Sequence, residues 1–233
     1  LAMGDSCIGG KTSINFKGYK NQLGNFYPPD SIFIDVSVLR RLDEEATRSG
    51  IGEMLHYFLV SSEKKLKIFE NNYHLALSGE IDNIETLINH SLRIKKEYIE
   101  DDEFDTDKRL ILNYGHSFGH AIEAASQYQI PHGIAVAHGM DMANYLSLRK
   151  GYIDDELYNY LRKILESIWS DIIPKEINCE DYISILRLDK KSIGQDLRLI
   201  LTKGIGKMFI EKIKIDDDFI RLIDLYIESN FNS

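Results

Sequence analysis

The 233-residue sequence contains only two cysteines, Cys7 and Cys179. Two distant cysteines provide neither a disulfide framework nor the paired spacing of a zinc site, so we expect a reducing, cytoplasmic setting. The sequence also lacks an apolar run long enough to span a bilayer, and it lacks a charged-then-apolar leader. These absences argue against a disulfide-stabilised secreted domain and against a membrane protein.

The chain has no excess of positive charge either. It contains 28 Lys and Arg residues against 37 Asp and Glu residues, which gives a net charge of −9. Non-specific nucleic-acid binding needs a basic face, so we expect no nucleic-acid partner. The content of 43% hydrophobic and 28% charged residues is ordinary for a soluble globular protein with a substantial core.

The sequence pattern changes near residue 42. Residues 1–30 are rich in glycine and polar groups and predict loops, and residues 31–35 (Ser-Ile-Phe-Ile-Asp) predict a short buried strand. From about Asp43 onward, apolar residues recur at helical spacing. We therefore expect residues 1–42 to be a remnant of an α/β unit and residues 43–233 to form a mainly helical domain.

The helical part contains several separate candidates. The apolar faces around residues 54–59 and 84–94 predict two helices, and residues 111–125, 135–148, 158–169 and 217–230 predict four more. Residues 197–201 and 208–213 flank a Gly-Ile-Gly turn and predict a β-hairpin. The predicted fold is thus mainly α with a small β component.

Three histidines and one glutamate dominate the chemistry. His116 and His120 are four residues apart on one predicted helix, His132 follows a proline at a loop-to-helix junction, and Glu53 lies near a predicted helix start. Isolated histidine pairs usually satisfy hydrogen bonds in a core. Imidazole and carboxylate groups, however, are the ligands of catalytic zinc sites, in which three protein ligands leave a position open for substrate. The residues alone leave open both interpretations, hydrogen-bonded core histidines and a catalytic metal site.

Basic residues form a second group, which comprises Lys11, Lys20, Lys95, Arg109, Lys190 and Lys191. Taken singly, each is typical of a solvated surface charge. Gly9-Gly10-Lys11-Thr12 is similar to the end of a phosphate-binding P-loop, but position 5 is Asp where that motif begins with glycine. We therefore reject a nucleotide-hydrolase site.

Several motifs in register resemble the 3-dehydroquinate synthase family of sugar phosphate cyclases. They are Asp5-Ser-Cys-Ile-Gly-Gly-Lys11-Thr-Ser-Ile-Asn15, Gly18-Tyr-Lys20-Asn21, Ser49-Gly-Ile-Gly-Glu53, Leu112-Asn113-Tyr-Gly-His116-Ser-Phe-Gly-His120-Ala-Ile-Glu123, His132-Gly133 and Asp189-Lys190-Lys191. The resemblance implies the C-terminal helical domain of that fold plus a remnant of an N-terminal NAD-binding α/β domain. It also implies NAD, a divalent metal (zinc or cobalt), a small phosphorylated sugar-acid substrate and a homodimer.

The resemblance assigns roles to individual residues. The metal ligands it implies are Glu53, His116 and His132. The cofactor-binding residues are Asp5, Lys11, Lys20 and Leu39. The catalytic or substrate-binding residues are Asp5, Asn21, His56, Lys95, Arg109, Asn113, His120 and Lys190. The implied reaction oxidises a substrate hydroxyl transiently with NAD, eliminates phosphate, reduces the ketone and closes a carbocycle by aldol addition.

Lys95 and Arg109 bear on the substrate. Both match positions that face the substrate carboxylate in the dehydroquinate branch, and a guanidinium matches a carboxylate with two parallel hydrogen bonds. The resemblance therefore implies a heptulosonate phosphate and a place in the shikimate pathway. Four positions depart from the family pattern: Arg41, Ala46, His56 and Ile134. They leave open a cyclase that acts on a neutral sugar phosphate.

The sequence has no Gly-rich dinucleotide-binding turn followed by an acidic residue. The family places those features before the position matched by Asp5, so we expect this sequence to be the C-terminal portion of a larger unit. A third hypothesis also stays open, in which a helical metal-binding domain has lost catalysis.

Overall fold

The computed structural model describes residues 2–16, 19–188 and 196–232. Its helices are α1 (Glu44–Ser61), α2 (Glu63–Leu77), α3 (Ile81–Asp101), α4 (His116–Ala125), α5 (His132–Arg149), α6 (Asp155–Trp169), α7 (Cys179–Arg187) and α8 (Asp217–Asn230). Three short 3-10 helices are η1 (Ala2–Gly4), η2 (Val36–Arg41) and η3 (Lys108–Asn113). Two antiparallel hairpins pair β1 (Ile14–Phe16) with β2 (Tyr19–Leu23), and β3 (Asp196–Thr202) with β4 (Met208–Lys214).

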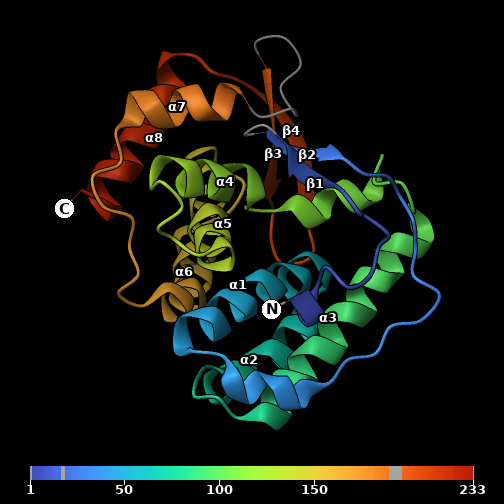
Figure 1. The fold of residues 1–233 in the computed structure, drawn as a ribbon. Helices are drawn as coiled ribbons and strands as arrows, with labels where there is room; N and C mark the ends of the chain where they lie inside the picture. Colours follow the sequence, from blue (N-terminus) through green and yellow to red (C-terminus); the bar gives the residue numbers. More distant parts are fainter. Residues whose placement is uncertain (1, 17–18, 189–195, 233) are drawn as a thin grey trace.

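Helices α1 and α5 cross at the centre of the molecule (Figure 1). Helices α2 and α3 pack against α1, while α4 and α6 pack against α5. Helix α7 lies on α4, α8 lies on α7 and α5, and strand β3 lies beside α5. The hydrophobic core runs through all of these contacts, and α5 is buried along most of its length.

Side-chain caps fix where most of these helices begin. Asp43 accepts a hydrogen bond from the Ala46 N–H at 2.7 Å, and Asp154 accepts one from the Leu157 N–H at 2.9 Å. Asp216 caps α8 in the same way. A short polar acceptor before an apolar periodic segment satisfies helix N–H groups that have no partner within the helix.

The predicted mainly helical fold is confirmed, and so is the C-terminal hairpin, which pairs Leu197 with Ile213 and Leu201 with Phe209. The prediction of one helix over residues 111–125 was wrong in its start. Residues 108–113 form η3, and α4 begins only at His116, after Gly115 with a φ of +80°. The left-handed turn at Gly115 separates the two segments.

The predicted buried strand over residues 31–35 was wrong. This segment forms no strand in the described part of the chain, and Phe33 is 95% exposed. A strand requires a partner for its backbone, and here Asp35 instead accepts a hydrogen bond from the Ser37 N–H and caps η2. Among the described residues before 42, the strands are β1 and β2, which lie inside the segment predicted to be loops.

Glycines allow the backbones of α1 and α5 to approach closely where they cross. A Cβ atom on Gly133 would lie 1.7 Å from the carbonyl oxygen of Ser49, and one on Gly52 would lie 2.5 Å from the carbonyl oxygen of Gly133. The Gly133 N–H donates a 3.0 Å hydrogen bond to the Ser49 hydroxyl. Since Gly52 precedes Glu53 and Gly133 follows His132, this crossing brings those two side chains together.

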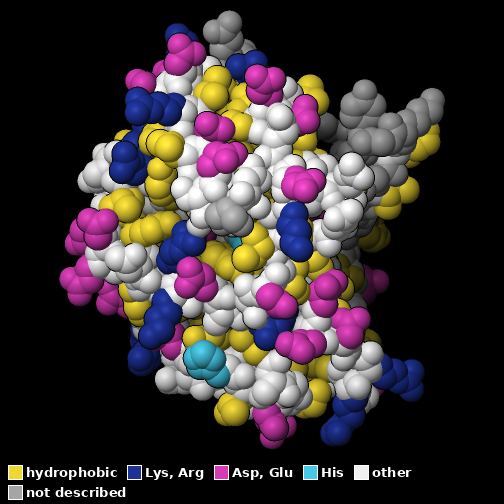
Figure 2. Space-filling view, turned by 90° about the vertical axis from the view of Figure 1, so that its left-hand side faces the viewer, with side chains coloured by type: hydrophobic (Ala, Val, Ile, Leu, Met, Phe, Trp, Pro, Cys, Tyr) yellow, Lys and Arg dark blue, Asp and Glu magenta, His cyan; other side chains and the backbone are white. Residues whose placement is uncertain are grey.

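No helix in the described part of the chain is long and apolar enough to cross a bilayer. Figure 2 shows the face that carries α6, α7 and α8, where acidic and basic side chains alternate with apolar ones.

The helix crossing generates a stability prediction. Gly133→Ala should lower the free energy of unfolding by about 3 kcal/mol or more, because the added methyl group meets backbone that is held on both sides. Gly151→Ala is the matched control, since Gly151 has a φ of +74° and no atom within 4 Å of an added Cβ. The control should lose about 1–2 kcal/mol for its left-handed backbone alone. Equal losses in urea denaturation would contradict the close crossing.

Candidate active site

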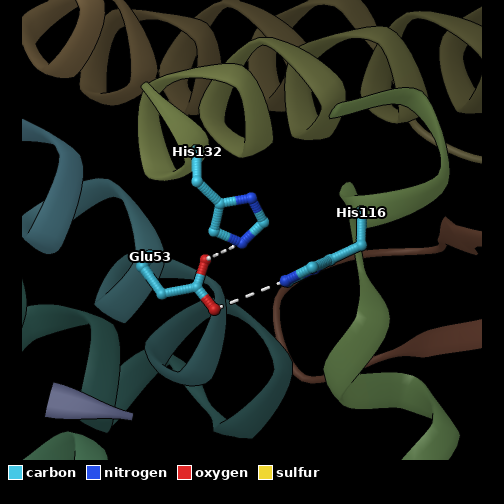
Figure 3. A group of neighbouring side chains, drawn as sticks. All are labelled: Glu53, His116 and His132. Carbon is cyan, nitrogen blue, oxygen red and sulfur yellow. Dashed lines mark hydrogen bonds and ion pairs between the residues drawn. The ribbon is translucent and has the colours of Figure 1, made fainter. Parts of the chain in front are cut away.

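Glu53, His116 and His132 point toward a shared space from three helices (Figure 3). Glu53 lies in the middle of α1, while His116 and His132 are the first residues of α4 and α5. Nε2 of His116 lies 3.4 Å from Oε1 of Glu53, and Nε2 of His132 lies 3.3 Å from Oε2 of Glu53. Tetrahedral zinc sites with bonds of about 2.0–2.1 Å hold neighbouring ligand atoms roughly 3.3–3.4 Å apart. The three side chains therefore fit a divalent ion.

The far side of each imidazole ring is held by a hydrogen-bond acceptor. Nδ1 of His132 lies 3.1 Å from Oε2 of Glu123, and Nδ1 of His116 lies 3.3 Å from the Tyr114 carbonyl oxygen. A proton on Nδ1 would donate to these acceptors and leave the Nε2 lone pair facing Glu53. This arrangement is typical of histidine ligands, whose outer partner fixes the tautomer.

The Glu53 carboxylate has an unfilled acceptor. Among the described residues, its buried Oε2 accepts no hydrogen bond despite the nearby His132 ring. Burial raises the pKa of Glu53, but the charge and hydrogen bond of His116 and the adjoining ring of His132 outweigh it. The net pKa lies well below the ordinary value. A buried, ionised carboxylate with an unsatisfied oxygen suits a cation.

A cavity of about 150 Å³ adjoins this cluster. Its lining combines carboxylate, imidazole and basic groups: Asp5, Ser6, Ile8, Lys11, Glu53, Tyr57, Lys95, Asp105, Arg109, Leu112, Asn113 and His116. Larger hollows lie elsewhere, such as one of about 300 Å³ beside Arg162 and Trp169, but its lining contains no candidate metal cluster. Chemistry rather than size therefore identifies the cavity beside Glu53 as the candidate active site.

Lys95 is held at the cavity wall by Asp5. Its Nζ lies 2.5 Å from Oδ1 of Asp5 and 2.8 Å from the Asp5 carbonyl oxygen. The Tyr57 hydroxyl donates to the same Oδ1. Lys95 is only 8% exposed, so its ammonium group is fixed in place and its charge is weakly screened. Asp5, Tyr57 and Lys95 thus form one polar unit at the cavity wall.

Arg109 lines the same cavity and is 2% exposed. Nη1 donates to the Glu103 carbonyl oxygen at 2.6 Å, and Nη2 donates to the Gly9 carbonyl oxygen at 3.0 Å. These hydrogen bonds to described residues use two of the five N–H donors of a guanidinium. The carboxylate of Asp102 accepts hydrogen bonds from the Thr106, Asp107 and Arg109 N–H groups, which orders the loop before Arg109.

The structure brings most of the sequence-predicted residues together. Asp5, Lys11, Lys95, Arg109 and Asn113 line the same cavity as Glu53 and His116. The ring of His120 packs against both other histidines, with centroids 5.6 Å from His116 and 5.5 Å from His132.

Other predicted residues lie apart from the cavity lining. His56 is 1% exposed, its ring lies 5.1 Å from that of His116, and its nitrogens have no hydrogen-bond partner among the described residues. Burial lowers the pKa of His56 to about 4, so its ring is neutral at physiological pH. The Leu39 side chain lies in the hydrophobic core.

Three predicted residues have no described side chain. Lys20 and Asn21 lie on β2, and the structure describes their backbone only. Lys190 falls outside the described residues.

Sequence reasoning missed three features of the candidate active site: Tyr57, Asp105 and the contact of Glu123 with His132. Tyr57 follows His56 in an apolar helix and looked like part of the core. Asp105 forms an ion pair with Lys11, which lies 94 residues away. Glu123 was visible three residues after His120, but its contact with His132 spans a loop that the sequence pattern leaves undefined.

Two family models match this chain. The model described as 3-dehydroquinate synthase N-terminal covers residues 1–49, and the one described as 3-dehydroquinate synthase C-terminal covers residues 50–192. The chain belongs to the 3-dehydroquinate synthase family. The resemblance seen in the sequence motifs is thereby confirmed.

Curated members of this family match over nearly the whole chain. The 3-dehydroquinate synthase of Dictyoglomus thermophilum is 40% identical over 224 residues, which are 96% of this chain and 63% of that protein. That of Clostridium acetobutylicum is 36% identical over 223 residues, or 94% of this chain and 61% of that protein. The chain thus spans less than two thirds of the length of these relatives.

Solved structures of sugar phosphate cyclases share the fold. A crystal structure of 2-deoxy-scyllo-inosose synthase complexed with carbaglucose-6-phosphate, NAD⁺ and Co²⁺ superposes with a TM-score of 0.87 at 26% identity, covering 99% of this chain and 65% of that one. ValA, the 2-epi-5-epi-valiolone synthase from Streptomyces hygroscopicus with NAD⁺ and Zn²⁺ bound, gives 0.81 at 22% identity, covering 98% and 63%. The second likeness supports the fold alone.

The site geometry predicts unequal titration of two histidines in the metal-free protein. Burial lowers the pKa of His132, but the hydrogen bond to Glu123 and the negative charges of Glu123 and Glu53 outweigh it and raise the pKa to about 10. Nitrogen-15 NMR of the histidine rings should show His132 protonated at pH 8 while His56, with a pKa of about 4, is neutral. Protonated His132 stabilises the fold fully below about pH 6.5, and this contribution is lost as the pH rises through about 10.

Glu123→Gln should lower the pKa of His132, because one of its two carboxylate partners becomes neutral. Glu97→Gln, on the exposed face of α3, is the control and should leave the titration of His132 unchanged. A His132 ring that titrates near pH 6.5 in all three proteins would contradict the two-carboxylate geometry.

Proposed function

We propose that this chain forms the metal- and substrate-binding part of a 3-dehydroquinate synthase-like enzyme, a carbocycle-forming phosphate lyase. Its substrate is a heptulosonate phosphate, and the reaction combines transient oxidation with NAD, phosphate elimination, reduction and intramolecular aldol closure. One observation carries the proposal. A single cavity joins Glu53 and His116 to the buried cations Lys95 and Arg109.

Glu53, His116 and His132 would hold a zinc or cobalt ion, as their ligand spacing and the unsatisfied Glu53 oxygen suggest. When bound, the ion supplies Lewis acidity toward a substrate oxygen, and NAD supplies a reversible hydride acceptor. The chain's own contribution is to fix the three ligands from three helices and to hold the histidine tautomers through Glu123 and Tyr114.

Lys95 and Arg109 would bind the substrate carboxylate. Both side chains are buried at the cavity wall, so their charges act through a medium of low dielectric constant. Backbone carbonyl groups and Asp5 hold them before substrate arrives, which reduces the entropy lost on binding. Arg109 retains donors for the paired hydrogen bonds that a carboxylate accepts.

Asn113 and His120 would bind the phosphate end of the substrate. Lys190 would add positive charge near this dianionic ligand. Asn113 lines the cavity next to His116, and His120 lies one helical turn beyond it. Asp5 and Asn21 would contact the substrate near the nicotinamide, while Lys11, Lys20 and the segment around Leu39 would contact NAD. The side chain of Leu39 is in the core, so that contact would use backbone. We also infer a homodimer, by family likeness.

A second candidate is a cyclase that acts on a neutral sugar phosphate. The 2-deoxy-scyllo-inosose synthase structure with carbaglucose-6-phosphate favours it through its fold likeness. His56 favours it too, because a buried neutral ring stands where the family pattern has a lysine that contacts substrate hydroxyls. His56 does not line the cavity among the described residues, so any effect on the substrate would be indirect.

Arg109→Gln separates the two candidates. In the full-length protein supplied with NAD and cobalt, this variant should lower kcat/KM for the heptulosonate phosphate about ten- to a hundredfold, because a buried charged hydrogen bond to the carboxylate is lost. Released phosphate and the cyclic product provide the measurement. Arg93→Gln, on the exposed face of α3, should keep wild-type activity.

Turnover of a neutral hexose phosphate that is insensitive to Arg109→Gln would instead favour the second candidate. Protein that binds metal and NAD but turns over neither substrate would contradict both.

A further inference from the structure

A second candidate metal cluster lies directly beside the first. Its members are His120, Glu123 and His132, whose ligand atoms lie within 4.8 Å of one another. His120 and Glu123 are three residues apart and lie on the same face of α4, and His132 is the first residue of α5. The cluster therefore shares one residue, His132, with the cluster of Glu53 and His116.

The imidazole of His132 is flanked by a carboxylate on each side. Nε2 lies 3.3 Å from Oε2 of Glu53, and Nδ1 lies 3.1 Å from Oε2 of Glu123. The ring of His120 lies nearly parallel to that of His132, with centroids 5.5 Å apart and an angle of 25° between the planes. Each nitrogen of His132 thus faces its own set of potential ligands.

We propose that His120, Glu123 and His132 form a second position for a divalent transition-metal ion, which competes with the position at Glu53, His116 and His132. This inference rests on the proposed first position. In the second position the ion takes Nδ1 of His132, an oxygen of Glu123 and a ring nitrogen of His120. These neutral imidazole and carboxylate ligands are of the kind that zinc and cobalt accept.

The two positions exclude each other because of the chemistry of a neutral imidazole. Such a ring has one nitrogen with a lone pair and one with a proton, so it binds one ion at a time. An ion on Nε2 leaves the Nδ1–H donating to Glu123. An ion on Nδ1 leaves the Nε2–H donating to Glu53. When the ion changes position, the ring therefore changes tautomer. In either position the carboxylate on the other side of the ring accepts the remaining N–H.

Equilibrium binding of Co²⁺ to the full-length protein, followed by visible absorption, tests this proposal. The wild-type protein should bind one ion. Glu53→Gln, which removes only a first-position ligand, should still bind one ion, about ten- to a hundredfold more weakly and with a changed spectrum. Glu53→Gln combined with His120→Phe should lose at least about a further tenfold in affinity, because the residual site loses a ligand.

His120→Phe alone is the matched control. It keeps an aromatic ring against His132 and removes only the ring nitrogens, so it should bind Co²⁺ with near wild-type affinity. His116→Phe offers an independent route, because it removes a different first-position ligand and should give the same residual, His120-dependent binding.

The outcomes separate this proposal from the proposed function. Residual Co²⁺ binding in Glu53→Gln that is unaffected by His120→Phe would overturn the second position alone. Two tightly bound ions in the wild-type protein would overturn the mutual exclusion. A wild-type protein that binds no Co²⁺ would overturn the first position, and the proposed function with it.

Discussion

The close contact between α1 and α5 is the constraint on which the site depends. Gly133 meets the backbone of α1 so closely that a methyl group in its place would lie 1.7 Å from the Ser49 carbonyl oxygen. A similar contact joins α5 to α4, where a Cβ on Gly139 would lie 2.1 Å from the Gly115 carbonyl oxygen. Together these contacts hold α5 against both α1 and α4. His116 and His132, at the starts of α4 and α5, thereby reach Glu53 on α1.

The buried charges around this crossing are arranged in partnered sets. Glu53 and Glu123 face the histidines, while Asp5 faces Lys95 and Tyr57. Burying an isolated charge is unfavourable, so each group needs an opposite charge or a hydrogen bond nearby. The result is a cavity that Glu53 and His116 line together with the buried basic side chains of Lys95 and Arg109. The same pairing that allows burial thus sets the polarity of the site.

Sequence reasoning succeeded where the signal was local. Apolar periodicity after Asp43 located α1, α3, α5, α6 and α8 but not α2 or α7. The four-residue spacing of His116 and His120 placed both on one helix face. Motif order then identified the family. The segment of residues 31–35 failed because its apolar run carried no information about a pairing partner, and it is exposed rather than buried.

The remaining errors concern contacts between distant segments. Glu53 was expected near the start of a helix but lies in the middle of α1. The helix begins after its N-cap Asp43, so the glycines just before Glu53 lie inside the helix. Glu123 and Tyr57 gain their roles from His132 and Asp5, which reach them only after α4, α5 and the N-terminal segment have packed. A spacing pattern within one segment does not contain such contacts.

The most direct test is to locate the ion itself. Crystals of the wild-type protein grown with Co²⁺ should show an anomalous-scattering peak about 2.0–2.2 Å from the Glu53 carboxylate and from Nε2 of both His116 and His132. Metal-replete crystals in which the peak lies away from Glu53 and His116, or in which no peak appears between these three side chains, would contradict the account.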